Sequence, residues 1–248
     1  MGEPALLAVA HGTRDPAGPA TVRALLDRVR ACRPGLPVRE GHAELAAPSL
    51  EEAARGIGGP VVAVPLMLAR GYHALNDIPR RVERVRPGAV TAGPLGPHPL
   101  LAAALADRLA ALPGGPGPSD AVVLGAAGSS DRAGVADVRA AARLLARRLG
   151  RPVPYGFVAA DGPALAGVVA EQRARGAGRV LVASYLLAPG HFHERMRAAG
   201  ADHVSAPLGA HDAVARVVLR RYDEGRTVTR IPSGIVRAVS AGAQITVA

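Results

Sequence analysis

Residues 61–71 read VVAVPLMLARG, and residues 180–190 read VLVASYLLAPG. Each segment is a nearly continuous apolar run that ends in glycine, which is typical of a buried strand followed by a turn. A strand that is apolar on both sides belongs to a parallel sheet covered by helices on both faces. The two segments therefore predict an α/β fold, and their likeness to each other indicates an internal repeat.

Two further pairs of segments align in the same order and at nearly the same offset. They are AHGTRDPAG (10–18) with AAGSSDRAG (126–134), and GPLGPH (93–98) with APLGAH (206–211). Ordered matches at a nearly constant spacing indicate that one structural unit is present twice.

The stretch PGGPGP at residues 113–118 lies between the two copies. Proline and glycine at this density continue neither a helix nor a central strand, which predicts a linker. We therefore expect an N-terminal lobe at residues 1–112 and a C-terminal lobe at residues 119–248, with a tail from about residue 226.

Each lobe alternates short apolar runs with longer segments of helical period, which predicts βαβ units and a four-stranded parallel sheet flanked by helices. The predicted strands are 5–10, 37–43, 61–67, 89–92, 121–126, 153–159, 179–186 and 202–205. The predicted helices of the first lobe are 17–31, 49–57, 75–85 and 98–111. The expected strand order is 2-1-3-4, and ligands are expected beyond the carboxyl ends of the strands.

The composition excludes several classes of function. The chain has 30 basic and 20 acidic residues, a net charge of +10, and every basic residue is arginine. Without lysine there is neither a Walker-type phosphate loop nor a Schiff-base enzyme. With Cys32 as the one cysteine there is no internal disulfide, Cys-rich zinc site or iron–sulfur cluster held by this chain alone.

The composition also restricts which binding partners are expected. Aromatic residues are 2% of the chain and the arginines are spread along the helices, which disfavours a nucleic-acid binder. No apolar run reaches the length of a membrane helix, and the first residues do not form a signal peptide. We therefore expect a cytoplasmic protein with no membrane partner.

Three residues of types that commonly bind metals stand at the ends of successive predicted strands in the first lobe. They are His11, Glu44 and His73. Adjacent strands lie about 4.8 Å apart, so these side chains are expected to converge at one edge of the sheet. Two imidazoles and a carboxylate suit a divalent first-row metal such as iron, cobalt or nickel. The same groups are able to accept protons at neutral pH.

The second lobe lacks all three of these side chains. In the repeat alignment, Ala127 stands in place of His11, Ala159 in place of Glu44 and Phe192 in place of His73. Their joint loss in a copy that keeps the surrounding frame indicates that the three residues form one functional unit.

Residues beside these three are secondary candidates for binding a ligand. Gly12, Thr13 and Arg14 precede a predicted helix whose free N–H groups suit an anion, although Thr13 or Asp15 serves equally well as a helix cap. Arg70 and Tyr72 flank Gly71 just before His73, and an arginine there is able to bind a carboxylate through two hydrogen bonds.

Four other histidines are weaker candidates. His191 and His193 sit where a second metal site would lie, but the alanines of the second lobe leave them without partners in register. His98 and His211 recur at equivalent helix starts, which favours a capping role over chemistry.

These segments resemble the sirohydrochlorin chelatases, the class II chelatases that insert a divalent metal into a tetrapyrrole. The resemblance is carried by AHGTRDPAG (10–18), AELAAPSLEEA (43–53), VPLMLARGYHALNDIP (64–79), GPLGPHP (93–99) and YLLAPGHFHERM (185–196). It implies two chelatase-like lobes with the substrate in the cleft between them, and His11, Glu44 and His73 as metal-binding residues. Arg70 stands where many members of the family have proline.

The resemblance implies insertion of Fe2+ or Co2+, with Ni2+ as a further possibility, for siroheme or cobalamin synthesis. The two substrates would be the metal and a carboxylate-rich tetrapyrrole. No organic cofactor is expected, and the protein is expected to be a monomer or a homodimer. A metallochaperone or tetrapyrrole carrier without catalysis is the alternative. A histidine phosphatase is a distant third, because Ala10 stands where that family has arginine.

Overall fold

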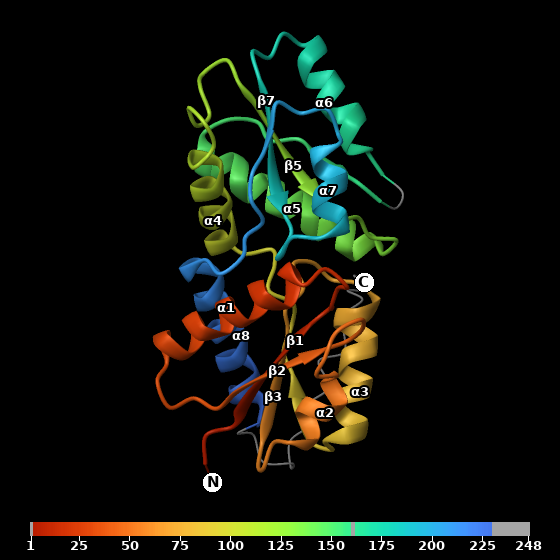
Figure 1. Cartoon of the computed structure of the whole chain (residues 1–248), viewed down its shortest axis with the longest axis vertical. Coiled ribbons are helices and arrows are strands. Elements are labelled where there is room, and N and C mark those ends of the chain that lie inside the picture. Colours follow the sequence, from red (N-terminus) through yellow and green to blue (C-terminus); the bar gives the residue numbers. More distant parts are fainter. Residues whose placement is uncertain (1, 160–161, 230–248) are drawn as a thin grey trace, which may run out of the picture.

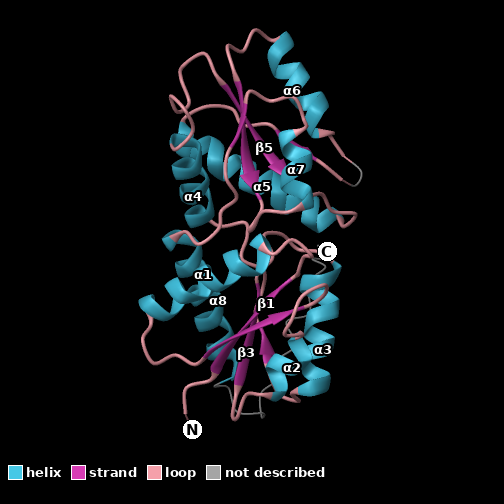
Figure 2. Cartoon of the chain, in the orientation of Figure 1, coloured by secondary structure: helices cyan, strands magenta, loops and turns pink. Residues whose placement is uncertain are grey.

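The computed structural model describes residues 2–159 and 162–229, which form two α/β units stacked end to end in Figure 1. Figure 2 shows a sheet between helices in each unit. Both sheets are parallel and four-stranded, with the orders β2-β1-β3-β4 and β6-β5-β7-β8. Both orders are the predicted 2-1-3-4 arrangement, so the predicted α/β class and parallel sheets are confirmed.

The first repeat contains β1 (Ala5–Ala10), α1 (Ala17–Cys32), β2 (Val38–His42), α2 (Leu50–Arg55), β3 (Val61–Pro65), η1 (His73–Asp77), α3 (Ile78–Val85), β4 (Val90–Thr91) and α4 (Pro99–Ala110). The second contains β5 (Ala121–Ala126), α5 (Arg132–Leu149), β6 (Tyr155–Phe157), α6 (Leu165–Ala174), β7 (Val180–Tyr185), α7 (His191–Arg197), β8 (His203–Val204) and α8 (Asp212–Thr229). All eight predicted strands are present. The helix predicted at 75–85 begins two residues earlier, as the π-helical turn η1.

The central strand β1 explains why the sheet is covered on both faces. All six of its residues are buried, and successive side chains point to opposite sides. Leu6, Ala8 and Ala10 belong to the large core that also contains the apolar face of α1, whereas Leu7 and Val9 belong to a smaller core with α2 and α3. Both sides of β1 therefore need apolar side chains, which explains why its apolar run is uninterrupted.

The last helix of each repeat packs on the other repeat, as Figure 1 shows for α4 and α8. Helix α8 lies on β3 and β4 of the first repeat, where a side chain at Gly225 would meet Val62 at 2.6 Å. Tyr222 of the same helix is fully buried and donates a hydrogen bond to the Pro4 carbonyl at 2.5 Å. Helix α4 packs on α5 and β7 of the second repeat. We call this arrangement the helix exchange.

The repeated GPLGPH and APLGAH segments are where the chain crosses between the units. The crossings are tied by equivalent arginines, because Arg221 of α8 donates to the Pro94 carbonyl at 2.7 Å and Arg108 of α4 donates to the Leu208 carbonyl at 2.9 Å. Each arginine thereby satisfies a backbone carbonyl of the segment that leads into the other repeat's exchanged helix.

The two units of the structure do not coincide with the predicted lobes 1–112 and 119–248, because α4 and α8 each pack in the unit of the other repeat. The stretch 113–118 separates the two sequence repeats, but it is a loop at the edge of the second unit, held by Arg179 through the carbonyls of Pro113 and Gly115. Helix α8 continues to Thr229, past residue 226 where the tail was expected to begin, and residues 230–248 lie outside the described residues. None of the described helices is both long and apolar enough to cross a membrane.

Candidate metal centre

The loops that follow β1 and β2 touch directly, which brings His11 and Glu44 to the same sheet edge. The backbone N–H of Glu44 donates to the His11 carbonyl at 2.8 Å. Gly12 has a φ of +95°, and a Cβ at this position would lie 1.7 Å from the Glu44 carbonyl oxygen. Only glycine combines this backbone conformation with so close an approach.

His73 reaches the same edge from the loop after β3. It opens η1, in which the N–H of Ile78 donates to the His73 carbonyl five residues earlier. Pro79 follows and has no N–H, so the turn is free to widen at this point. The ring centroids of His73 and His11 are 4.8 Å apart, and His73 Nε2 lies 4.0 Å from Glu44 Oε1.

The environment of His11 favours its neutral form. Burial lowers the pKa of His11 below its ordinary value of 6.5, and the neighbouring His73 lowers it further, against the opposing effects of Glu44 and Asp77. A neutral imidazole carries the lone pair that a metal requires.

Asp77 is a residue of this site that the sequence reasoning missed. Its carboxylate lies 3.3 Å from His73 Nδ1, one helical turn away, so that Nδ1 donates the hydrogen bond and Nε2 remains free to bind a metal. Carboxylates commonly orient metal-binding histidines in this manner. The signal was the four-residue spacing from His73 to Asp77, which fits one face of a helical turn.

Arg81 connects the loop after β2 with the turn η1 and with helix α2. It donates to the carbonyl of Ala43, next to Glu44, at 2.8 Å and to the carboxylate of Asp77 at 3.3 Å. Two more hydrogen bonds, at 2.7 and 2.9 Å, bind Glu51 of α2. The hydrogen bonds to Arg81 hold the pKa of Glu51 below its usual range, which keeps this supporting ion pair charged.

A cavity of about 380 Å³ lies between the two repeats and opens onto His11. The first repeat contributes His11, Gly12 and Thr13, and the second contributes residues 186–193. The lining is largely apolar, with four histidines, which are His11, His42, His191 and His193. A cavity of this kind suits a flat apolar ligand that also presents polar groups.

His11, Glu44 and His73 are neighbours but do not yet surround a common point. Within residues 2–159 and 162–229, no three histidine, cysteine, aspartate or glutamate side chains are arranged to hold a metal ion as they stand. The side chains of His73 and Glu44 are 37% and 48% exposed, so they have room to turn toward one another. Binding of a metal would require this rotation.

The secondary candidates have different surroundings. Gly12 and Thr13 line the cavity, Arg14 is exposed beside them, and the exposed Tyr72 ring stands edge-on to His73 at 5.8 Å. Asp15 accepts a hydrogen bond from the N–H of Ala17 at 2.9 Å and so occupies the start of α1. This contact corresponds to the capping alternative.

Arg70 is not directed toward the cavity as the ligand-binding prediction required. Its guanidinium binds Asp137 of α5 at 2.7 to 3.1 Å, so in this structure it is already paired with a carboxylate of the protein. The partner lies 67 residues away in an ordinary helical segment, which is why the sequence pattern did not identify it.

The other histidines separate into two kinds. His98 and His211 each accept a hydrogen bond at 3.1 Å from the N–H two residues ahead, so their predicted capping role is confirmed. His193 is buried and its Nε2 donates to the Ser205 carbonyl at 3.1 Å, whereas His191 is exposed at the start of α7. Both line the cavity opposite His11.

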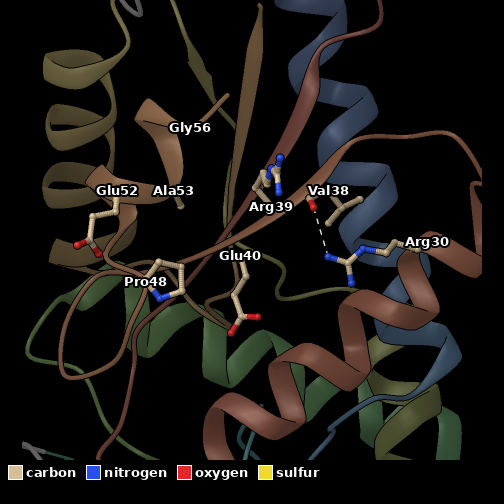
Figure 3. Close-up of a pocket in the computed structure, with 8 residues that line it drawn as sticks. All are labelled: Arg30, Val38, Arg39, Glu40, Pro48, Glu52, Ala53 and Gly56. Carbon is tan, nitrogen blue, oxygen red and sulfur yellow. Dashed lines mark hydrogen bonds between the residues drawn. The ribbon is translucent and has the colours of Figure 1, made fainter. Parts of the chain in front are cut away.

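A second cavity lies on the outer edge of β2 and is separate from the three strand ends. Figure 3 shows its lining, which consists of Arg30, Val38, Arg39, Glu40, Pro48, Glu52, Ala53 and Gly56. Glu40 binds Nε2 of the buried His42 at 2.9 Å. The lining contains no histidine, cysteine or other soft metal ligand, so we assign the chemistry to the cavity between the repeats.

The second repeat preserves the frame of the site without its ligands. The N–H of Ala159 donates to the Ala127 carbonyl at 2.8 Å, which is the same contact that joins Glu44 to His11. The loops after the first two strands of each repeat are therefore joined in the same way, but alanines stand in the second repeat where the first has His11 and Glu44.

Comparisons with known proteins identify the family. The CbiX family model matches residues 5–112 and 121–225. A sirohydrochlorin cobaltochelatase of Methanosarcina acetivorans is 36% identical over 78 residues, which are 30% of this chain and 60% of that protein. A second, from Methanosarcina barkeri, is 35% identical over 30% of this chain and 61% of its own length. The chain thus matches about three fifths of the length of these curated relatives.

Solved structures agree with the fold over nearly the whole chain. SirB from Bacillus subtilis, solved with Fe3+, is 27% identical, with a TM-score of 0.77 over 91% of this chain and 96% of its own. DR2241 from Deinococcus radiodurans, a multi-domain protein with structural similarity to chelatases, is 26% identical, with a TM-score of 0.70 over 90% of this chain and 56% of its own. Because the family model covers both repeats, and with them most of the chain, this protein belongs to the CbiX family.

Proposed function

We propose that this protein inserts Fe2+ or Co2+ into sirohydrochlorin or a closely related tetrapyrrole, as a step in siroheme or cobalamin synthesis. The observation that carries the proposal is the pair of imidazoles at 4.8 Å, with Glu44 beside them, one of which, His11, lines a cavity between the repeats. The names of the relatives support the reaction, since they are sirohydrochlorin cobaltochelatases and a SirB solved with Fe3+.

In this mechanism His11, Glu44 and His73 hold the metal that is to be transferred. Three protein ligands leave coordination positions open for the pyrrole nitrogens. The depressed pKa of His11 keeps its lone pair available at neutral pH, and Asp77 holds the Nδ1–H of His73 so that Nε2 turns to the metal. His11 therefore offers a free lone pair, and the contact with Asp77 leaves Nε2 of His73 as its metal-binding atom.

The tetrapyrrole would occupy the cavity against the apolar residues of the second repeat. The net charge of +10 attracts a substrate that carries a rim of carboxylates. Two pyrrole N–H protons leave as the divalent metal enters, and a histidine of the cavity accepts one of them while solvent water accepts the other. No covalent intermediate with the protein is required.

The test is the metallation rate of His11→Ala, followed by absorbance and compared with the spontaneous rate in buffer. Loss of the enhancement is expected, and His203→Ala on β8, outside the cavity lining, is the matched control. An unchanged rate in His11→Ala would refute the assignment. Parallel assays with Fe2+, Co2+ and Ni2+ identify the preferred metal.

The metallochaperone or carrier alternative predicts a different result in the same assay. Such a protein binds the metal or the tetrapyrrole tightly but leaves the metallation rate at the level of buffer. The wild-type rate therefore separates the two functions before any variant is made.

A further inference from the structure

The segment that leads from β3 to His73 is held by two side chains of the second repeat. Asp137 of α5 accepts the backbone N–H of Arg70 at 2.8 Å and three hydrogen bonds from its guanidinium at 2.7 to 3.1 Å. Tyr185 of β7 donates its hydroxyl to the Leu68 carbonyl at 2.8 Å. Residues 68–70 are thus fixed from outside their own repeat, three residues before His73.

The contact is close and sheltered. The Asp137 carboxylate is 6% exposed, and a Cβ at Gly134, one turn earlier in α5, would lie 2.5 Å from the Arg70 carbonyl. A buried carboxylate is stabilised only when its hydrogen bonds are satisfied, and here the loop itself supplies the donors. The position of the loop and the position of α5 are therefore coupled.

The internal repeat provides a comparison, because the equivalent contact is absent on the other side. Thr21 of α1 is the counterpart of Asp137, Pro189 is the counterpart of Arg70, and Leu66 is the counterpart of Tyr185. Thr21 donates its hydroxyl to Ala17 of its own helix, and Pro189 has neither an N–H nor a charge. All three members of the contact are present only where the loop carries a metal-binding histidine.

We propose that Asp137 and Tyr185 are positioning residues through which the second repeat, itself lacking the ligands, holds His73 in place for metal binding. The inference rests on the proposed function for the role of His73 as a ligand. Arg70 serves in this arrangement as the basic partner of Asp137, in place of contact with the substrate. The second repeat thereby has a part in metal binding besides forming one wall of the cavity.

The test compares Asp137→Ala, Asp137→Asn and Tyr185→Phe with wild type in the full chain. The first measurement is the Kd for Co2+ without tetrapyrrole, from titration of its visible absorption. We expect about tenfold weaker binding in Asp137→Ala, the lower end of what is lost when a group that orients a metal ligand is removed. Asp137→Asn, which keeps an acceptor for the Arg70 N–H, should recover part of the affinity.

The matched control is Asp120→Ala. Asp120 is 5% exposed, pairs with Arg179 at 2.6 and 3.2 Å and accepts the Gly117 N–H at 2.6 Å, so it is an equally buried ion pair away from the site. Its removal should lower thermal stability but leave the Kd for Co2+ unchanged. Equal Co2+ affinity in wild type and Asp137→Ala, or equal loss in Asp120→Ala, would overturn the proposal.

A second measurement separates this inference from the proposed function. The NMR signals of the His73 ring in the metal-free protein should shift and broaden in Asp137→Ala and Tyr185→Phe, but not in Asp120→Ala. If the ring signals respond while His11→Ala leaves Co2+ binding intact, the proposed metal site fails and the positioning role stands. Unchanged ring signals in both test variants would refute the positioning role.

Discussion

Asp77 Oδ2 lies 3.3 Å from His73 Nδ1 and also 3.3 Å from Arg81 Nη1. One carboxylate oxygen therefore faces both the imidazole of the proposed ligand and the arginine that binds the loop of Glu44. Through this oxygen the orientation of His73 depends on the position of the β2 loop.

Replacement of Asp77 by asparagine should weaken metal binding about tenfold, because a neutral amide holds the Nδ1–H less strongly and makes Nε2 a poorer donor to the metal. The Kd for Co2+, measured by titration, provides the test. Asp107→Asn on α4, outside the cavity lining, serves as the control. A wild-type Kd in Asp77→Asn would show that His73 is oriented by other contacts.

The pKa of His11 gives a prediction for acid conditions. Since burial and His73 lower this pKa, an NMR titration of the metal-free protein should place the His11 midpoint below 6.5, and His73→Ala should move it upward. In this range the unfolded chain binds more protons, so the free energy of unfolding falls as pH drops below 6.5. The fall should be smaller in His11→Asn. A His11 midpoint above 6.5 would contradict the assigned environment.

Substitution of Gly12 by alanine tests the close approach of the β1 and β2 loops. The new Cβ would meet the Glu44 carbonyl at 1.7 Å, and a φ of +95° is itself strained for alanine by about 1–3 kcal/mol. We expect reduced stability in urea and loss of Co2+ binding. Gly35→Ala combines a φ of +87° with open space and isolates the effect of the backbone angle. Equal Co2+ binding by both variants would argue against a role for this contact.

The helix exchange predicts how a fragment behaves. Residues 1–112 lack α8, which covers β3 and β4, but contain α4, which covers the equivalent strand β7 in the full chain. Two copies of the fragment are able to exchange their α4 helices and restore both sheets. Light scattering coupled to size exclusion should therefore give twice the fragment mass. A stable, folded monomer would contradict the exchange.

The sheets were predictable because each strand is a local apolar run whose register is set by its neighbours. The three candidate ligands at the strand ends followed from the same pattern, since parallel strands end at one edge. The exchange of α4 and α8 was not predictable in this way. The two helices occupy equivalent positions in the two sequence repeats. The sequence therefore does not show which sheet each helix covers.

The supporting residues of the site were missed for a related reason. Asp77 and Arg81 read as ordinary charged residues of a helix start, and Asp137 as an exposed helical aspartate. The roles of Arg81 and Asp137 depend on partners in other elements, which for Asp137 lie 67 residues away. Single residues acquire such roles only through tertiary contacts.

The pairing of Arg70 with Asp137 has a consequence for how the duplicated chain differs from a symmetric dimer. In a dimer of identical subunits, every substitution appears twice, so an aspartate that supports one site also appears beside the other. Fusion of the two copies removes this constraint. One half is then free to keep the reactive groups. The other half, which has no site of its own, is free to acquire residues such as Asp137 and Tyr185 that support its partner's site.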